Sequence, residues 1–160
     1  MTTPDVPVEI ERKWAPDLPV NRPERAVLLE QGYLAHGEDA EVRVRRCGDQ
    51  AWLTVKRGEG LVRIEVEVVI SGAAFEELWA ATAGAQLAKH RQEFLVDGRE
   101  ASLDTYTGAL EGLQVVEVEF PDESTARAFT APTWFGTEVT GRRDYTNSAL
   151  ARARRCPEAQ

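Results

Sequence analysis

The sequence contains little cysteine and no long apolar run. Its two cysteines, Cys47 and Cys156, are too few for a disulfide framework, and neither lies in a spacing typical of zinc ligands. No apolar stretch approaches the roughly 20 residues that a membrane helix requires, so no membrane partner is expected. Residues 1–7 lack the basic start and apolar run of a secretory signal, and we therefore expect a cytoplasmic protein.

Excess positive charge is also missing. The chain has 19 Lys and Arg against 27 Asp and Glu, which gives a formal net charge of -8. Because nucleic-acid binding depends mainly on neutralising phosphates, no nucleic-acid partner is expected. Any phosphate that the chain binds must be bound locally. With 160 residues, of which 42% are hydrophobic and 29% charged, the chain has the length of a single globular domain over residues 1–160.

Turn residues interrupt the chain often, and the runs between them alternate between apolar and polar side chains. This alternation is typical of antiparallel strands rather than of a helical bundle. We predict helices over 73–83, 123–130 and 146–155, with Ser71 capping the first and either Asp122 or Ser124 capping the second. Irregular loops are expected over 12–25 and 133–143. Strands are predicted over 8–14, 26–34, 40–46, 51–56, 61–70, 88–96, 99–106 and 114–120.

Charged side chains gather on one face of four predicted strands. Successive residues of a strand point to opposite faces, so residue parity sorts each run into two sets. The charged sets contain both signs, whereas the opposite sets are mostly Val and Ile. The charged sets are Glu9, Glu11 and Lys13; Glu41, Arg43 and Arg45; Arg63, Glu65 and Glu67; and Glu117 and Glu119.

This segregation has two interpretations. An ordinary sheet with one wet face would explain any single strand. A wet face usually mixes charges with Thr, Ser and Gln, however, and the predicted helices need the apolar faces to pack on. The charged faces would then point inward, and a closed barrel of about eight strands can hold one small ligand. We therefore expect a mainly β protein with flanking helices, built on an eight-stranded antiparallel closed β-barrel with a charged interior.

The charged residues also follow a family order. Residues 9–13, Glu-Ile-Glu-Arg-Lys, have the form ExExK. Further motifs follow along nearly the whole chain: residues 31–34 (Gln-Gly-Tyr-Leu), 41–45 (Glu-Val-Arg-Val-Arg), 53–56 (Leu-Thr-Val-Lys), 63–67 (Arg-Ile-Glu-Val-Glu), 89–91 (Lys-His-Arg), Asp104, 116–119 (Val-Glu-Val-Glu) and 145–150 (Tyr-Thr-Asn-Ser-Ala-Leu). This order resembles the CYTH superfamily, the triphosphate tunnel metalloenzymes. The short length and residues 132–136, Pro-Thr-Trp-Phe-Gly, resemble its small bacterial members that act on inorganic tripolyphosphate.

The resemblance implies a metal-dependent triphosphatase that splits tripolyphosphate into pyrophosphate and orthophosphate. A triphosphate calls for a row of cations, and guanidinium groups can grip two phosphate oxygens at once. Carboxylates beside it need a hard divalent cation, Mg²⁺ or Mn²⁺, between them. The resemblance places the substrate on Lys13, Arg43, Arg45, Lys56, Lys89 and Arg91, with Arg63 as a further candidate. It places metal on Glu9, Glu11, Glu117 and Glu119, with Glu65, Glu67 and Asp104 as candidates for a second ion.

A second role for Lys89 follows from the same resemblance. In some small family members a lysine and a tyrosine form a dyad that assists the leaving group or the water, and Tyr33 matches that tyrosine. A tyrosine that only packs at the barrel rim is the alternative. Trp52 either stacks on an organic base inside the tunnel or packs at its rim. Parity puts His90 outside the tunnel.

The motifs leave several alternatives open. Hydrolysis of thiamine triphosphate or of a nucleoside triphosphate, and class IV adenylate cyclase activity, occur in the same superfamily. A polyphosphate-binding module without turnover is an alternative of another class, although a binder needs the cations far more than the carboxylates. Related sequences more often carry a basic residue where this chain has Asp144, which leaves the part played by the C-terminal segment open. His36 lies in a turn and is expected to be inert. The expected partner is a small-molecule triphosphate, bound by a monomer or a homodimer.

Overall fold

The computed structural model describes residues 8–37, 40–58 and 61–158. Within these residues the chain forms three α-helices: α1 (Gly72–Ala81), α2 (Glu123–Ala128) and α3 (Asn147–Ala153). None of these described helices is long and apolar enough to span a membrane. Single 3₁₀ turns lie at Gly108–Leu110, Thr133–Phe135 and Arg143–Tyr145. The same residues form nine strands: β1 (Val8–Ala15), β2 (Ala26–His36), β3 (Ala40–Cys47), β4 (Gln50–Arg57), β5 (Val62–Ile70), β6 (Gln86–Val96), β7 (Arg99–Tyr106), β8 (Gln114–Glu119) and β9 (Thr137–Glu138).

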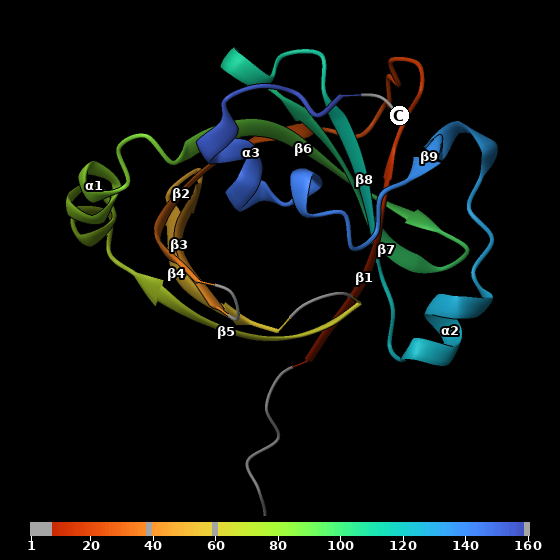
Figure 1. Ribbon diagram of the computed structural model, residues 1–160, viewed down its shortest axis with the longest axis horizontal. Coiled ribbons are helices and arrows are strands. Elements are labelled where there is room, and N and C mark those ends of the chain that lie inside the picture. Colours follow the sequence, from red (N-terminus) through yellow and green to blue (C-terminus); the bar gives the residue numbers. More distant parts are fainter. Residues whose placement is uncertain (1–7, 38–39, 59–60, 159–160) are drawn as a thin grey trace, which may run out of the picture.

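Eight strands close into a barrel, which Figure 1 shows as a ring. Antiparallel pairing joins β5, β4, β3, β2, β6, β7, β8 and β1 in that order, and β1 also pairs with β5. Residues 8–10 of β1 pair with residues 62–64 of β5, whereas residues 11–14 pair with residues 116–119 of β8. This double pairing closes the sheet, so that the barrel strands leave no long unpaired edge. The predicted eight-stranded antiparallel closed barrel is confirmed.

The predicted strands are all present, and each strand end lies within two residues of its predicted position. β9 is an addition inside the loop predicted over 133–143. It pairs with Trp14 and Ala15 at the end of β1. The first irregular loop therefore begins at Pro16 rather than at residue 12, because β1 continues as far as its pairing with β9.

α1 covers the outer side chains of β2, β3 and β4. Its Phe75 is fully buried and packs in one cluster with Val44 and Ala51, which point outward from the barrel wall. The helix begins after Ser71, whose hydroxyl oxygen accepts a hydrogen bond from the backbone N–H of Ala74 at 3.1 Å. The predicted cap is therefore confirmed.

α2 packs beside β1 over a second apolar cluster. Asp122 is its N-cap, because Asp122 Oδ1 accepts a hydrogen bond from the backbone N–H of Thr125 at 2.8 Å. Ser124, the alternative cap, donates its hydroxyl to Asp122 at 2.6 Å. Trp14 of β1 meets Phe129 edge to face, with ring centroids 5.7 Å apart.

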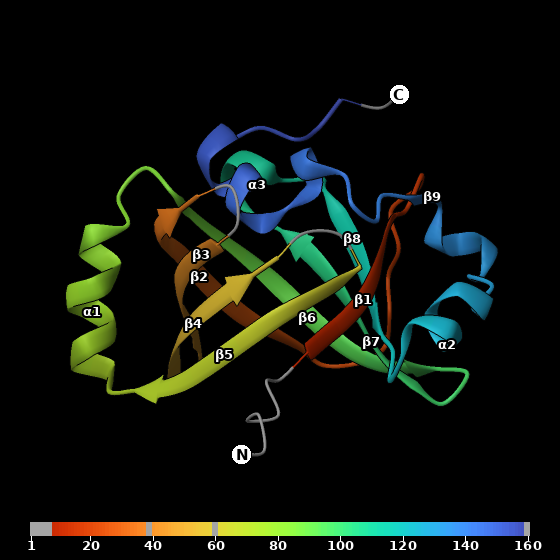
Figure 2. The same ribbon diagram turned by 60° about the horizontal axis from the view of Figure 1, so that its bottom comes forward.

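Part of the outer barrel wall has no helix over it. Val55, Ile64, Val66 and Val68 point outward from β4 and β5, and between 38% and 50% of each residue is exposed. The expectation that helices cover the apolar faces is thus met only in part. The reason is the position of α3, which contacts β2 and β6 at one end of the barrel, as Figure 2 shows.

Candidate active site

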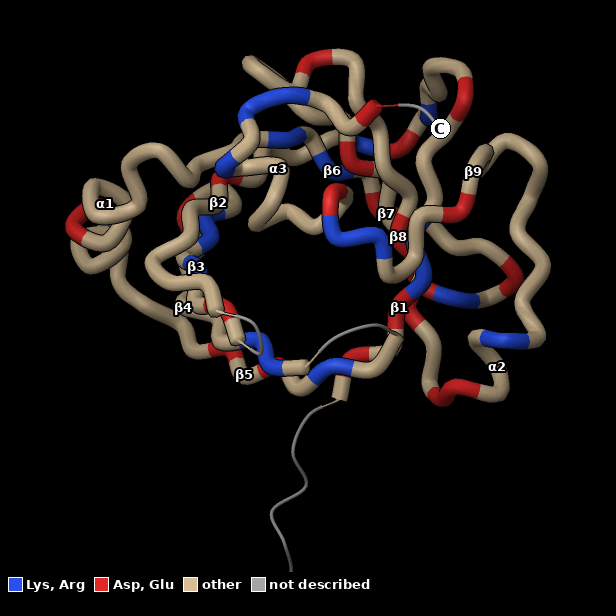
Figure 3. Tube along the Cα trace, viewed as in Figure 1, with Lys and Arg blue, Asp and Glu red and all other residues tan. Residues whose placement is uncertain are grey.

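The barrel encloses a cavity of about 1140 Å³. Its lining is charged because the ionic faces of the strands point inward, as their parity predicts. Figure 3 shows Lys and Arg mixed with Asp and Glu around the barrel. The cavity is lined by every predicted substrate-binding and metal-binding residue except Lys89 and Asp104, namely Glu9, Glu11, Lys13, Arg43, Arg45, Lys56, Arg63, Glu65, Glu67, Arg91, Glu117 and Glu119.

One string of ion pairs joins β1, β8 and β6 inside the cavity. Lys13 and Glu117 are cross-strand partners, and Lys13 Nζ lies 2.7 Å from Glu117 Oε1 and 3.1 Å from Glu11 Oε1. Arg91 Nη2 lies 2.6 Å from the other Glu117 oxygen, Oε2. Burial alone would raise the pKa of Glu117, but Lys13 and Arg91 hold that pKa well below its ordinary value. Glu117 is therefore an ionised, fully paired carboxylate.

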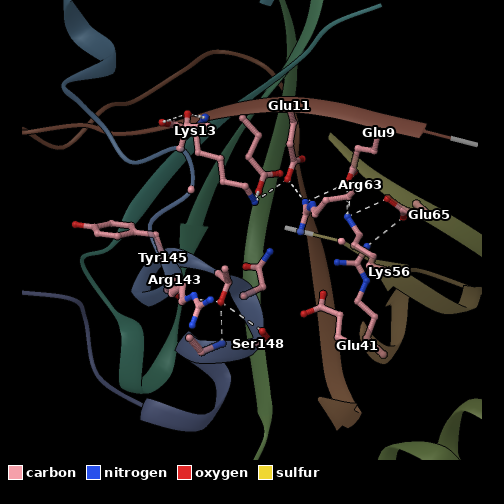
Figure 4. Close-up of a pocket in the computed structure, with 18 of the residues that line it drawn as sticks. Glu9, Glu11, Lys13, Glu41, Lys56, Arg63, Glu65, Arg143, Tyr145 and Ser148 are labelled. Atoms are coloured by element: carbon pink, nitrogen blue, oxygen red, sulfur yellow. Dashed lines mark hydrogen bonds and ion pairs between the residues drawn. The ribbon is translucent and has the colours of Figure 1, made fainter. Parts of the chain in front are cut away.

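A second string joins β4, β5 and β1, and Figure 4 shows its side chains. Lys56 Nζ lies 2.7 Å from Glu9 Oε2 and 2.9 Å from Glu65 Oε2. Arg63 Nη2 lies 3.0 Å from the same Glu9 oxygen and also contacts Glu11 Oε1. Strand register explains these contacts, because Glu9 lies directly opposite Arg63, and Lys56 lies directly opposite Glu65.

Arg43 and Arg45 make few close contacts with carboxylates in the described part of the cavity. Arg43 Nη2 has Glu65 Oε1 at 3.4 Å, and Arg43 Nε is buried with no hydrogen-bond partner among the described residues. Arg45 Nε lies 3.4 Å from the neutral Gln31 Oε1. Burial, together with the charges of Arg43 and Arg91, lowers the pKa of Arg45 to about 10. An anion bound between these guanidinium groups would relieve both the missing hydrogen bonds and the repulsion.

Carboxylates crowd together where β1 meets β8. Glu11 and Glu119 lie directly opposite each other in the strand register, an arrangement in which like charges repel. Burial and the neighbouring Glu9 and Glu11 raise the pKa of Glu119. A hard divalent cation would remove this repulsion, and carboxylate oxygens are the ligands that Mg²⁺ and Mn²⁺ prefer. The chemistry of this donor set therefore fits the predicted metal.

The carboxylates do not yet converge on one point. In the part of the chain that the structure describes, no three His, Cys, Asp or Glu side chains lie close enough together to hold a metal ion. The ion pairs explain this, because Arg63 holds Glu9 and Glu11 and Lys13 holds Glu117. Binding a metal ion here requires these pairs to be exchanged, and the metal-ligand assignments stay predictions.

Lys89 and Asp104 form a fully buried ion pair inside the barrel, and neither residue is among those that line the cavity. Lys89 Nζ lies 2.5 Å from Asp104 Oδ2, and both side chains are 0% exposed. Arg91 completes the cluster, with Nε and Nη2 each 2.7 Å from one Asp104 oxygen. Burial lowers the pKa of Lys89 to about 8, although Asp104 opposes this shift. Because neither side chain lines the cavity, the substrate role of Lys89 and the metal role of Asp104 stay predictions.

Tyr33, the other member of the predicted dyad, is also buried. It packs in one apolar cluster with Leu150 of α3, and its hydroxyl oxygen accepts a hydrogen bond from Gln31 Nε2 at 2.7 Å. Burial raises the pKa of Tyr33 to about 12, although the nearby Arg43 opposes this shift. Among the described residues no hydrogen bond joins Tyr33 to Lys89, and Tyr33 does not line the cavity. The dyad stays a prediction, and the packing alternative accounts for the observed position.

The structure also places Trp52, His90 and His36, for which the sequence predicts positions. Trp52 does not line the cavity, which favours the packing alternative over stacking on a base. His90 is exposed and lies outside the cavity, in line with its parity. His36 departs from its expected position in a turn, because it ends β2 and lines the cavity, with Nδ1 3.9 Å from Glu41 Oε2.

The segment after β9 also lines the cavity, which sequence reasoning missed. Arg142, Arg143 and Arg152 add cations to its wall. Asp144 is bound to Arg142, with Oδ2 2.6 Å from Nη2, and so lowers the net positive charge that this segment supplies. The signal that could have revealed the segment is the occurrence of three arginines around a motif already matched to the family at residues 145–150.

Asn147, at the start of α3, ties this segment to the barrel. Its Oδ1 accepts a hydrogen bond from the Tyr106 hydroxyl at 2.5 Å and lies 3.4 Å from Lys89 Nζ. Tyr145 and Ser148 line the same cavity as the strand side chains, and in Figure 4 the ring of Tyr145 points away from Lys13 and Glu11. The buried layer beneath the cavity therefore also positions its C-terminal wall.

Comparison with known proteins gives close relatives over most of the chain, although no family model matches it. The inorganic triphosphatase of Nitrosomonas europaea is 43% identical over 145 residues, which cover 89% of this chain and 96% of that protein. The inorganic triphosphatase of Acetivibrio thermocellus is 38% identical over 130 residues, which cover 80% and 82%. A crystal structure of an inorganic triphosphatase shares 40% identity and a TM-score of 0.67, covering 95% of this chain and 96% of its own.

More distant structures share the fold alone. A Hippeastrum protein with 14% identity has a TM-score of 0.56 and covers 74% of this chain and 82% of its own. The two triphosphatases show the family as well as the fold, because they are 43% and 38% identical to this chain over 89% and 80% of its length. The chain belongs to the inorganic triphosphatases of the CYTH superfamily, the triphosphate tunnel metalloenzymes.

Proposed function

We propose that this enzyme hydrolyses inorganic tripolyphosphate to pyrophosphate and orthophosphate, with Mg²⁺ or Mn²⁺ as its cofactor. One observation carries the proposal. A single cavity holds the incompletely neutralised Arg43 and Arg45 together with the crowded carboxylates of Glu11 and Glu119. A triphosphate that carries a divalent cation supplies oxygens for the first pair and a cation for the second.

The charge of the cavity favours this combined ligand over either part alone. Bare polyphosphate would be repelled by the carboxylates, and a bare metal ion would be repelled by the cations. The ion pairs observed along the wall show that both sets are close to balance without a ligand. A ligand that brings both signs of charge keeps that balance. The balance matters because an unpaired charge removed from water is costly.

The basic and acidic side chains then have different roles in binding the substrate and the metal ion. Arg43 and Arg45 hold phosphate oxygens through paired N–H donors, while Lys13 and Lys56 turn from carboxylates to phosphates. A divalent cation on the carboxylates would neutralise phosphate charge and lower the pKa of a water molecule. The water oxygen bonds to a terminal phosphorus and loses a proton to solvent, the P–O bond to the bridging oxygen breaks, and pyrophosphate leaves. Phosphoryl transfer of this kind needs mainly positioning and charge stabilisation.

The lining favours an inorganic over an organic triphosphate. The aromatic groups of the described lining are Tyr145 and Phe120, of which only 8% and 7% are exposed, and the imidazole of His36. A base therefore finds little aromatic surface to stack on. Thiamine triphosphate, a nucleoside triphosphate and class IV adenylate cyclase chemistry are the alternatives within enzymes. A binding module without turnover is the alternative outside them, and the relatives named as triphosphatases count against it.

Several further assignments stay predictions from the sequence. Lys89 and Tyr33 are the candidates for a dyad that assists the leaving group or the water. The enzyme is expected to work in the cytoplasm, as a single domain and as a monomer or homodimer.

Phosphate release from tripolyphosphate, ATP and thiamine triphosphate tests the proposal directly. Each substrate is incubated with Mg²⁺, with Mn²⁺ and with EDTA. We expect fast, metal-dependent release from tripolyphosphate and little from the two organic substrates. Faster hydrolysis of ATP or thiamine triphosphate would show that the substrate is organic and contradict the proposal. Tight binding of tripolyphosphate without phosphate release would point to the binding module.

A further inference from the structure

Arg63 of β5 lies between two carboxylates that we propose as metal ligands. Glu9 and Glu11 are two positions apart on β1, so both side chains point into the barrel. Arg63 Nη2 lies 3.0 Å from Glu9 Oε2 and also contacts Glu11 Oε1, an arrangement that Figure 4 shows. One nitrogen atom thus bridges both carboxylates, which are the side chains that a divalent cation would need as ligands.

The guanidinium group of Arg63 is only partly used in this position. Both contacts come from the same nitrogen, and Arg63 Nε is buried with no hydrogen-bond partner in the described part of the chain. Arg91 in the same cavity offers a contrast, because its Nε and Nη2 each bind one oxygen of Asp104. A guanidinium fork suits a single oxyanion that accepts two parallel hydrogen bonds. Arg91 has such a partner, and Arg63 does not.

Arg63 nevertheless stays charged where it is. Burial alone would lower its pKa, but Glu11 and Glu9 hold the pKa of Arg63 above its ordinary value. The guanidinium can leave these carboxylates only if another cation replaces it and an anion receives it, because either charge left alone away from water is costly.

We infer that Arg63 is an exchangeable counterion: it leaves Glu9 and Glu11 when they take a divalent cation, and its freed guanidinium then binds a phosphate oxygen of the substrate. The inference rests on the proposed function, which supplies the metal and the triphosphate. It assigns Arg63 two successive partners within one binding event. Metal and triphosphate then strengthen each other's binding. The metal ion replaces Arg63 on Glu9 and Glu11, and the phosphate oxygen receives the freed guanidinium group.

Mn²⁺ alone is the probe, because its binding to the free enzyme needs no substrate. Loss of the electron paramagnetic resonance signal of free Mn²⁺ reports the bound fraction. Arg63→Gln removes the competing cation, so Mn²⁺ should bind at least about tenfold more tightly than to the wild type. Arg63→Lys keeps the charge without the fork and should show a smaller gain. Thermal melting of each variant establishes that it is folded.

Arg45→Gln is the matched control. It removes the same charge from the same cavity, but from a guanidinium that contacts Gln31 rather than Glu9 or Glu11. Its affinity for Mn²⁺ should change far less than that of Arg63→Gln. Equal affinities in wild type and Arg63→Gln, or an equal gain in Arg45→Gln, would overturn the exchange. If Arg63→Gln does not fold, an Arg63→Lys protein that binds Mn²⁺ no more tightly than the wild type would also count against it.

Failure of the Arg63 exchange can be distinguished from failure of the proposed function. Metal-dependent tripolyphosphate hydrolysis by the wild type, with no change of Mn²⁺ affinity in Arg63→Gln, removes the exchange and leaves the function standing. No hydrolysis of any triphosphate by the wild type removes the function, while tighter Mn²⁺ binding by Arg63→Gln still supports displacement of Arg63 by a metal ion.

Discussion

Lys89 Nζ and Asp104 Oδ2 lie 2.5 Å apart, and neither side chain has any exposed surface. Arg91 shares Asp104 with Lys89, and it also reaches Glu117 in the cavity. The charged wall of the active site therefore rests on a second, buried layer of charge. Changes in this layer are expected to alter stability and its dependence on pH.

Lys89→Met should remove a rise in stability at alkaline pH. Burial lowers the pKa of Lys89 to about 8 in the folded protein, whereas a lysine in an unfolded chain titrates near pH ~10.4. Between these values the unfolded chain holds a proton that the folded protein lacks, so the wild-type free energy of unfolding should increase with pH. The variant should lack this increase. Urea unfolding at several pH values between 8 and about 10 measures the difference.

Lys13→Met is the control for this experiment. Burial there is outweighed by Glu11 and Glu117, which raise the pKa of Lys13 above its ordinary value. Lys13 should therefore stay charged throughout the same range in the folded protein, and its replacement should leave the alkaline rise in place. Parallel pH curves for wild type and Lys89→Met would contradict the lowered pKa of Lys89.

Glu117→Gln should make the free energy of unfolding less sensitive to a fall in pH. Lys13 and Arg91 outweigh burial and hold the pKa of Glu117 well below its ordinary value. Its stabilising effect is therefore present above the unfolded pKa of about 4.3 and is lost as the pH falls from there through the folded pKa. At pH 7 the variant leaves Lys13 paired only with Glu11 and Arg91 paired only with Asp104, at a cost of about 2 kcal/mol. The difference in the free energy of unfolding between wild type and variant should disappear at acidic pH.

Urea unfolding at neutral and acidic pH measures this gap. Glu123→Gln is the control, because the side chain of Glu123 is 51% exposed and its pair with Arg127 is an i,i+4 pair at the surface. That change should cost less than about 0.5 kcal/mol. A cost of Glu117→Gln that is the same at both pH values would argue against its paired, ionised state.

Arg43→Met should weaken substrate binding without weakening the fold. Arg43 has a buried Nε without a hydrogen-bond partner among the described residues, and its Nη2 lies 3.4 Å from Glu65 Oε1. Glu65 keeps its pair with Lys56 when Arg43 is replaced, so an apolar side chain is expected to change the melting temperature little. KM for tripolyphosphate should rise about tenfold or more, because charge-assisted hydrogen bonds to phosphate are lost. Arg127→Met, at a side chain 72% exposed, should change neither quantity.

Gly136→Ala should destabilise the junction between β9 and β1. Gly136 has φ 74°, and an added Cβ would lie 2.4 Å from the backbone oxygen of Ala15. Gly141 has nearly the same φ, 75°, but nothing within 4 Å of its added Cβ. Gly141→Ala should therefore cost about 1 kcal/mol for backbone strain alone, and Gly136→Ala about 2 kcal/mol more for the clash. Equal losses in chemical unfolding would show that the clash relaxes freely.

The strands were predictable because their signal is local. Alternation along each run places Glu9, Glu11 and Lys13 on one face, and a closed barrel of eight strands turns that face inward. β9 had no such signal, because its two residues are held by pairing with the end of β1 rather than by their own sequence. The position of α3 inside one end of the barrel is likewise decided by packing of Leu150 in the interior cluster, which residue periodicity does not reveal.

The site residues, too, were predictable where their signal is local and were missed where long-range packing places them. Residues on strands reach the cavity as their parity predicts. Lys89 and Tyr33 share that parity, yet neither lines the cavity, because the C-terminal segment returns over this part of the wall and brings Leu150 and Asn147 against it. The cations of that segment were missed for the same reason, since a contact such as that between Lys89 and Asn147, 58 positions apart, has no trace in a local pattern.

The double pairing of β1 has a consequence for the order in which the protein matures. β1 has partners at residues 62–64 and at residues 116–119, so its pairing is complete only after residue 119 has been made. Glu11 therefore cannot meet Glu119 until β8 joins the barrel. A chain truncated before β8 carries Glu9, Glu11 and Arg63 without Glu117 and Glu119.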